Sequence, residues 1–151
     1  MLLKNLTTII ICLLLSARTV TAQDFVAELV YCFNSPPPET PDARVSAETL
    51  EKIEKTFGYQ HARIAQITTS PLDKRKSDFP PLGKDFSLKI EQLEQKDGQY
   101  KLRVNFWHKD KSVVETVVDF EKGTPLYIKG PLYDRGLLVL IIRVDDSSPA
   151  K

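Results

Sequence analysis

Residues 122–144 read KGTPLYIKGPLYDRGLLVLIIRV, a segment with three glycines, two prolines and a strongly apolar end. The glycines match no phosphate-binding fingerprint, because neither GxGxxG nor GxxxxGK[ST] occurs. We interpret them as turn residues between short strands, with Gly130-Pro131 breaking one strand from the next. The apolar end predicts a closing strand that is covered on both faces. Its apolar run, residues 137–142, is too short to cross a bilayer, which takes about 20 residues.

The segments before this stretch alternate apolar and polar residues, which is the pattern of half-buried strands. Three segments share it: residues 86–91, 100–107 and 112–120. Asp97-Gly98 lies between the first two and is a strong hairpin signal, because both central residues of that tight turn need positive φ. Further turns are predicted at residues 109–111 and 121–123. This succession of strands and short turns predicts a C-terminal antiparallel β-meander.

The clearest helix begins after Ser46, whose hydroxyl suits the free backbone N–H groups of a first turn. Apolar residues then recur at helical spacing and form one stripe. The stripe consists of Ala47, Leu50, Ile53 and Phe57. Gly58 follows as a left-handed C-cap. We interpret this segment as an amphipathic helix that packs on a sheet.

The rest of the N-terminal half contains two more predicted strands and two proline-containing connectors, the first of which is residues 34–44. Residues 25–33 favour a buried strand, with a short helix as the alternative, and residues 59–69 favour a strand that leaves the helix. The second connector, residues 70–85, carries Lys74-Arg75-Lys76, which we interpret as a solvated loop tip. The sequence therefore predicts a single α+β domain, with one amphipathic helix packed on a mainly antiparallel sheet of about six strands.

The N-terminal 22 residues have the organisation of a secretory signal peptide. Lys4 gives a positive start, residues 9–15 form a short apolar run, and residues 20–22 (VTA) carry small side chains where a signal peptidase reads. The apolar run is shorter than a membrane span requires. We therefore predict cleavage after this segment, and a mature protein that is periplasmic or extracellular without a transmembrane segment.

The mature chain is expected to be one exported domain, residues 23–145, with a disordered tail, residues 146–151. Lys4 and Arg18 are the only charged residues removed, which leaves 19 of the 21 basic residues against all 20 acidic ones. A chain so close to neutrality lacks the electrostatic footprint of a nucleic-acid binder, so no nucleic-acid partner is expected.

The residues that carry most protein chemistry are few. The mature chain keeps one cysteine, Cys32, in an apolar segment, which predicts a buried thiol; an intermolecular disulfide is the alternative. His61 and His108 lie in no metal-ligand spacing, and no GxSxG elbow occurs. We therefore assign no catalytic residue, metal or cofactor. A Cys–His nucleophile pair stays open, because such partners are neighbours in space rather than in sequence.

The most suggestive surface residues are aromatic and basic. Arg103, Asn105 and Trp107 alternate on the polar face of one predicted strand, and Tyr127 and Lys129 are expected to share that face two strands away. Trp, Tyr and Arg are enriched at binding hot spots, which makes these five residues the candidate binding site. The alternative is that Trp107 packs beneath the helix or the long loop.

Residues 114–144 (VETVVDFEKGTPLYIKGPLYDRGLLVLIIRV) resemble the sheet segments of bacterial outer-membrane secretin channels, where a G-x-x-hydrophobic-x-G turn joins two strands. Residues 50–67 (LEKIEKTFGYQHARIAQI) are similar to the periplasmic ring-building domains of the same machines. The chain departs from the family in lacking the long membrane-inserted strands, and in having Gly-Pro where a second Gly-Gly is usual. The resemblance implies an accessory periplasmic domain that assembles through sheet edges.

We expect a non-catalytic exported domain that acts by protein–protein contact or self-association, as an accessory to envelope secretion or pilus-type assembly. Strand addition at a sheet edge is the expected physical mode. The alternative is a secreted small-ligand-binding or inhibitor domain that uses the sheet face around Trp107.

Overall fold

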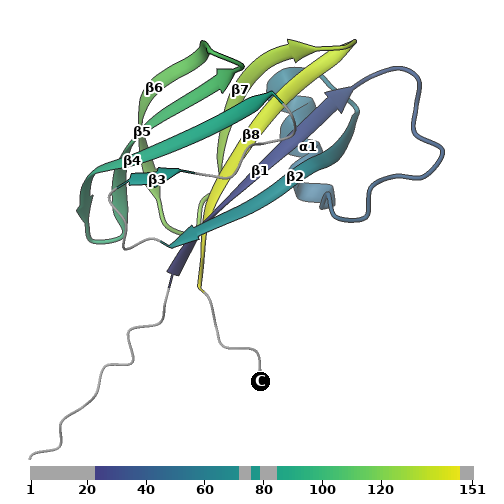
Figure 1. Cartoon of the computed structure of the whole chain (residues 1–151). Helices are drawn as coiled ribbons and strands as arrows, with labels where there is room; N and C mark the ends of the chain where they lie inside the picture. The colour runs from purple at the N-terminus through teal and green to yellow at the C-terminus, as the bar shows by residue number, and fades with distance from the viewer. Residues whose placement is uncertain (1–22, 72–75, 79–84, 147–151) are drawn as a thin grey trace, which may run out of the picture.

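The computed structural model describes residues 23–71, 76–78 and 85–146 (Figure 1). Three predicted features lie wholly or partly outside the described residues: the signal peptide, the loop tip Lys74-Arg75-Lys76 and the tail. Of the loop tip only Lys76 is described, and it begins a short strand rather than lying in a loop. Asp146, the first residue of that tail, belongs to the last strand.

The described strands form two four-stranded antiparallel sheets rather than one. Sheet A has the order β2 (His61–Pro71), β1 (Gln23–Phe33), β8 (Gly136–Asp146) and β7 (Leu126–Tyr133). Sheet B has the order β3 (Lys76–Asp78), β4 (Phe86–Lys96), β5 (Gln99–His108) and β6 (Lys111–Glu121). The predicted class, antiparallel sheet with one helix, is confirmed, but the single sheet of six strands is wrong. The helix packs on one apolar face of sheet A. The other face of sheet A is also apolar, and sheet B packs against it.

The main core lies between the two sheets. Phe25, Ala27 and Leu29 of β1 face sheet B together with alternate residues of β8. Sheet B contributes the inward side chains of its meander, among them Leu102 and Phe106. Burying each large apolar side chain of this kind stabilises the fold by about 1.5–3 kcal/mol. The inter-sheet core therefore holds the meander against sheet A.

Helix α1 (Ala47–Phe57) covers the opposite face of sheet A. Both predicted caps are confirmed: the Ser46 hydroxyl accepts a hydrogen bond from the Thr49 N–H at 3.1 Å, and Gly58 adopts φ 79°. Ile53 is fully buried against Cys32 and its neighbours on β1 and β8. The buried thiol is thus confirmed, and burial raises the pKa of Cys32 to about 12.

Strand β8 lies between these two layers, which confirms that it is covered on both faces. Val139 is 0% exposed on the helix side, and Leu140 is 1% exposed on the side of sheet B. In Figure 1, β8 and β1 run through the middle of the molecule between α1 and the meander. The strongly apolar sequence of residues 137–142 follows from this position, since neither face meets water.

The Asp97-Gly98 hairpin is confirmed, with φ angles of 51° and 78°. The predicted strand break at Gly130-Pro131 is wrong, because both residues lie within β7 as an irregularity between Lys129 and Leu132. β7 is an edge strand, so the missing N–H of Pro131 leaves no ladder partner unsatisfied. A Cβ on Gly130 would lie 2.6 Å from the Leu138 carbonyl oxygen, so the bulge needs glycine.

Candidate functional site

The predicted residues of β5 lie together on the outer face of sheet B. Arg103 Nη1 donates to Glu91 Oε2 at 2.8 Å, and Lys89 Nζ lies 5.6 Å from the centroid of the Trp107 ring. Asn105 lies between them on the strand, and all three β5 side chains are partly exposed. The helix lies on the far face of sheet A, so Trp107 does not pack beneath it. The expected row on β5 therefore exists on the outer face of sheet B. Most of the long loop, residues 70–85, lies outside the described residues, so packing of Trp107 beneath that loop stays a prediction.

Tyr127 and Lys129 do not join that surface. They lie on β7 in sheet A, paired with Ile141 and Val139, and Tyr127 packs against the residues beneath α1. The five predicted residues are thus divided between the outer faces of two different sheets. The chain passes from sheet B to sheet A in the turn before β7, and strict alternation gives no sign of such a crossing.

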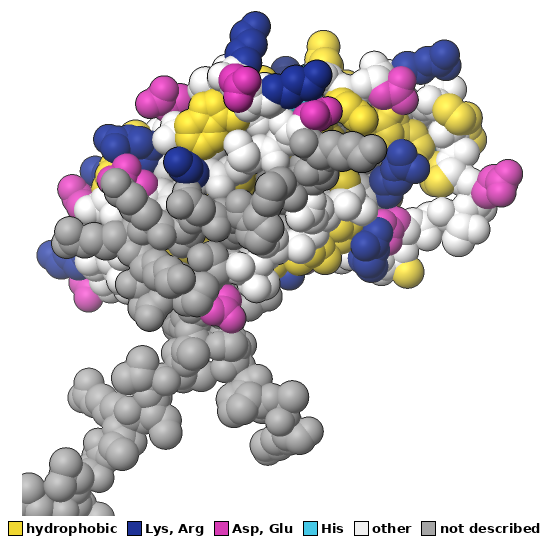
Figure 2. All heavy atoms as spheres, in the orientation of Figure 1, with side chains coloured by type: hydrophobic (Ala, Val, Ile, Leu, Met, Phe, Trp, Pro, Cys, Tyr) yellow, Lys and Arg dark blue, Asp and Glu magenta, His cyan; other side chains and the backbone are white. Residues whose placement is uncertain are grey.

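Charged side chains of both signs are interspersed on the face shown in Figure 2, with apolar side chains between them. Such a mixed surface favours no highly charged partner on this face. Candidate binding sites are therefore sought in the backbone groups of the sheet edges and in hollows of the surface rather than in charged patches.

The outer edge of sheet B is formed by β6, an 11-residue strand without proline. Among the described residues it pairs on one side only, with β5, and the register is regular from Val114 to the end of the strand. Val117 is 52% exposed on the outer face. Val114 and Val118 point inward, are only partly buried and pack at the margin of the core. An additional strand beside β6 would cover that margin.

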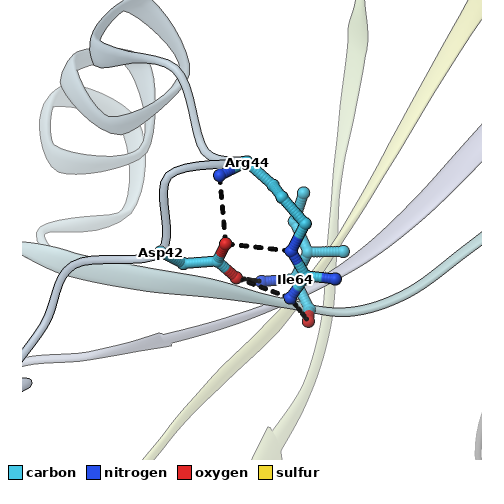
Figure 3. Close-up of polar contacts among 3 residues, drawn as sticks. All are labelled: Asp42, Arg44 and Ile64. Atoms are coloured by element: carbon cyan, nitrogen blue, oxygen red, sulfur yellow. Dashed lines mark hydrogen bonds and ion pairs between the residues drawn. The ribbon is translucent and has the colours of Figure 1, made fainter.

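The edge at β2 is blocked by side chains at Ile64 (Figure 3). The Ile64 N–H donates to Asp42 Oδ2 at 3.0 Å, and Arg44 Nη2 donates to the Ile64 carbonyl oxygen at 3.0 Å. Asp42 and Arg44 therefore fill the places that the backbone of another strand would take. The Arg44 guanidinium, with the backbone N–H groups of Ile64 and Arg44, holds the pKa of Asp42 well below its usual range.

The two remaining edges also carry features that oppose strand addition. β7 contains the Gly130-Pro131 bulge, and bulges and prolines both interrupt the regular row of backbone groups that an incoming strand needs. β3 has three described residues and pairs only with residues 89–91 of β4. The rest of β4 has no described partner on that side, but β4 is irregular between Gln92 and Glu94. β6 has one irregularity near its start and then keeps a regular ladder from Val114 to Glu121.

A second surface of interest is a hollow of about 560 Å³ at one end of sheet A. We call it the aromatic hollow, and the lining residues that matter most are Tyr31, Phe33, Pro36, Arg63, Asp134 and Arg135. They come from β1, β2, the proline connector after β1 and the turn between β7 and β8. Sequence reasoning missed this hollow, because only the strand register brings these segments together. The nearest signal is the alternation of Tyr31 and Phe33 directly before the proline run.

The aromatic hollow belongs to a row of rings that links the two sheets and includes both histidines. Its centroid separations are 5.6 Å for His61–Phe33, 5.3 Å for Phe33–Tyr31, 6.1 Å for Tyr31–Tyr133, 6.1 Å for Tyr133–Phe86 and 4.7 Å for Phe86–His108. The two histidines therefore lie at opposite ends of the row. Each packs on a phenylalanine ring, which accounts for their presence in structural terms.

Cys32 and His61 do not form a nucleophile pair. Cys32 is buried on the helix side of sheet A, whereas His61 packs on Phe33 on the opposite side. The raised pKa of the Cys32 thiol keeps it protonated near neutrality. Within residues 23–71, 76–78 and 85–146, no three His, Cys, Asp or Glu side chains are grouped closely enough to hold a metal ion.

No helix in the described part of the chain has the length and apolar character needed to cross a membrane. No known protein-family model, curated protein or solved structure matches this chain. Its function must therefore be inferred from its own surfaces, of which the β6 edge and the aromatic hollow are the best defined.

Proposed function

We propose that this chain is an exported, non-catalytic domain that binds another protein by accepting an extended strand beside β6. The observation that carries the proposal is the contrast between the described edges. β2 is blocked at Ile64 by Asp42 and Arg44, β7 is interrupted by a bulge, and β3 is very short, whereas β6 keeps a regular ladder from Val114 to Glu121. Natural sheets usually protect an edge of this kind unless it has a partner.

The side chains of β6 define the strand that would fit. Backbone hydrogen bonds supply affinity in strand addition, and alternate side chains supply specificity. On the inner side the new strand would lie beside Val114 and Val118, which favours apolar residues. On the outer side it would lie beside Glu115, Val117 and Asp119, so Lys or Arg flanking an apolar residue matches best.

The proposed place of action is outside the cytoplasm, in an envelope secretion or pilus-type assembly. The signal-peptide pattern supports export, and β1 begins at Gln23, so cleavage after Ala22 leaves every described strand intact. The resemblance of residues 114–144 to secretin sheet segments supports an assembly role. N-terminal sequencing of the mature protein should find Gln23 first; an uncut chain in the cytoplasm would contradict export.

Strand addition is tested by photo-crosslinking in the producing cell. A photoreactive residue at Val117 should give a defined adduct, and the same residue at Leu132 should not, because Leu132 is exposed on the bulged edge. Adding Thr116→Lys should abolish the adduct, since an inward-pointing lysine on an edge strand blocks pairing. Equal adducts at both positions, or a monomer that forms none at Val117, would refute the proposal.

The alternative function, binding of a small ligand or inhibitor target around Trp107, keeps one supporting observation. Trp107 is partly exposed with Lys89 above its ring, which is an arrangement suited to a flat anionic group. Trp107 is the only tryptophan, so its fluorescence reports on this face alone. Quenching by a small molecule that is lost in Lys89→Gln would favour this alternative over strand addition.

A further inference from the structure

We propose that the aromatic hollow is a binding site for a small organic monoanion, a carboxylate attached to a flat apolar body. The site shares no lining residue with β6, so it is independent of the proposed strand addition. Its volume of about 560 Å³ lies inside the range of about 300–1,000 Å³ that small-molecule sites occupy.

The apolar part of the site is a set of rings. Tyr31 and Phe33 line the hollow and stack with an interplanar angle of 17°. Tyr133 lies outside the lining and supports the Tyr31 ring by an edge-on contact. Pro36 adds a rigid wall from the connector. Ring and proline surfaces of this kind suit a flat ligand, because stacking and edge contacts both add to simple burial.

Gly136 holds this ring surface in place. A Cβ at this position would lie 2.1 Å from the Cys32 carbonyl oxygen and 2.8 Å from Tyr31 Cε2. Glycine therefore lets the Tyr31 ring lie directly on the backbone of β8. The ring is fixed from below by this contact and from the side by Phe33, so the floor of the hollow is formed before any ligand arrives.

The polar part of the site is the guanidinium groups of Arg63 and Arg135. Arg63 Cζ lies 5.2 Å from the centroid of the Tyr31 ring, and Arg135 comes from the turn before β8. Neither arginine forms an ion pair with a residue that the structure describes. Arginine binds carboxylates through paired hydrogen bonds, so both groups are available to a ligand anion.

The acidic residues of the hollow set the charge of that anion. Asp42 also lines the hollow, but its carboxylate is already matched by Arg44. Asp134 is the remaining acid, so two arginines and one aspartate leave a single positive charge. A monoanion balances this charge, whereas a dianionic phosphate monoester would leave an excess negative charge beside Asp134.

The test uses phenylacetate as the probe, followed by amide chemical shifts of the full mature chain at pH 7. Phenylacetate should shift the amides of Tyr31, Arg63 and Arg135 with a dissociation constant of about 1 mM or tighter. Three related compounds serve as comparisons: phenylacetamide lacks the charge, acetate lacks the ring, and phenyl phosphate carries a second negative charge. Each should bind at least about tenfold more weakly than phenylacetate.

Two variants and one control complete the test. Arg63→Gln and Arg135→Gln should each weaken phenylacetate binding about tenfold, since each removes one charge-assisted pair. Lys96→Gln removes a positive charge from an exposed residue at the end of β4 that does not line the hollow, and it should leave binding unchanged. The proposal is overturned by absent shifts, by phenylacetamide or phenyl phosphate binding as tightly as phenylacetate, or by arginine variants that bind like the wild type.

Discussion

Replacing Leu138 with Asp is expected to unfold the domain, because this residue lies in the strand that is covered on both faces. Leu138 is 3% exposed and packs in the inter-sheet core. The substitution removes about 1.5–3 kcal/mol of apolar burial. It also places a carboxyl group without a partner in that core, which costs about 2–7 kcal/mol. The combined loss of about 4–10 kcal/mol is comparable to the whole stability of a domain, about 5–15 kcal/mol.

Urea unfolding followed by circular dichroism measures this effect. Leu132→Asp is the matched control, because Leu132 is 78% exposed on the neighbouring strand and should change stability by at most about 0.5 kcal/mol. With a denaturant slope of about 1–3 kcal/mol per molar, even a 5 kcal/mol loss moves the midpoint by about 2–5 M. A cooperative transition for Leu138→Asp at the control's midpoint would refute the burial of β8 on both faces.

Three further outcomes test other parts of the fold. Gly136→Ala should lower stability by about 1–3 kcal/mol, because its methyl group overlaps backbone and ring; a wild-type urea midpoint would contradict this. Asp42→Asn should destabilise the domain at pH 7. The pKa of the Asp42 carboxyl is lower in the folded protein than its ordinary value of about 3.9 in an unfolded chain. The ionised carboxylate therefore stabilises the fold above about pH 3.9, and this stabilisation is lost as the pH falls toward the pKa of the folded protein. The difference between Asp42→Asn and the wild type should therefore shrink on acidification, and a constant difference would contradict the ion pair with Arg44. Cys32 should resist iodoacetamide at pH 8 in the folded protein and react in urea, since its pKa is raised to about 12; alkylation of the folded protein at the unfolded rate would contradict its burial.

The local features of this fold could be predicted from the sequence because each depends on a few adjacent residues. Ser46 and Gly58 fix the ends of the helix, and Asp97-Gly98 fixes a hairpin, through backbone conformations that those residue types prefer. The division into two sheets could not be predicted in the same way. An alternating strand looks the same whether its apolar face meets a helix or a second sheet, so the crossing before β7 leaves no local sign.

The candidate sites show the same limit. The row of Arg103, Asn105 and Trp107 follows from alternation within one strand, and the structure keeps it on one face. The position of Tyr127 and Lys129 depends on which sheet their strand joins, and the sequence pattern does not indicate this. The aromatic hollow depends on the pairing of Tyr31 with Arg63 across two strands and on a distant turn, which no spacing in the sequence encodes.

The side-chain clamp at Ile64 has a consequence for the stoichiometry of any complex. An open filament of stacked strands requires two accepting edges on every subunit, so that each addition creates the next site. Sheet A is blocked at Ile64 of β2 by Asp42 and Arg44 and is interrupted at β7. Sheet B offers the ladder of β6 opposite a described strand of three residues. If the proposed strand addition occurs, growth by strand pairing is therefore expected to end after one addition, giving a complex with one added strand rather than a fibre.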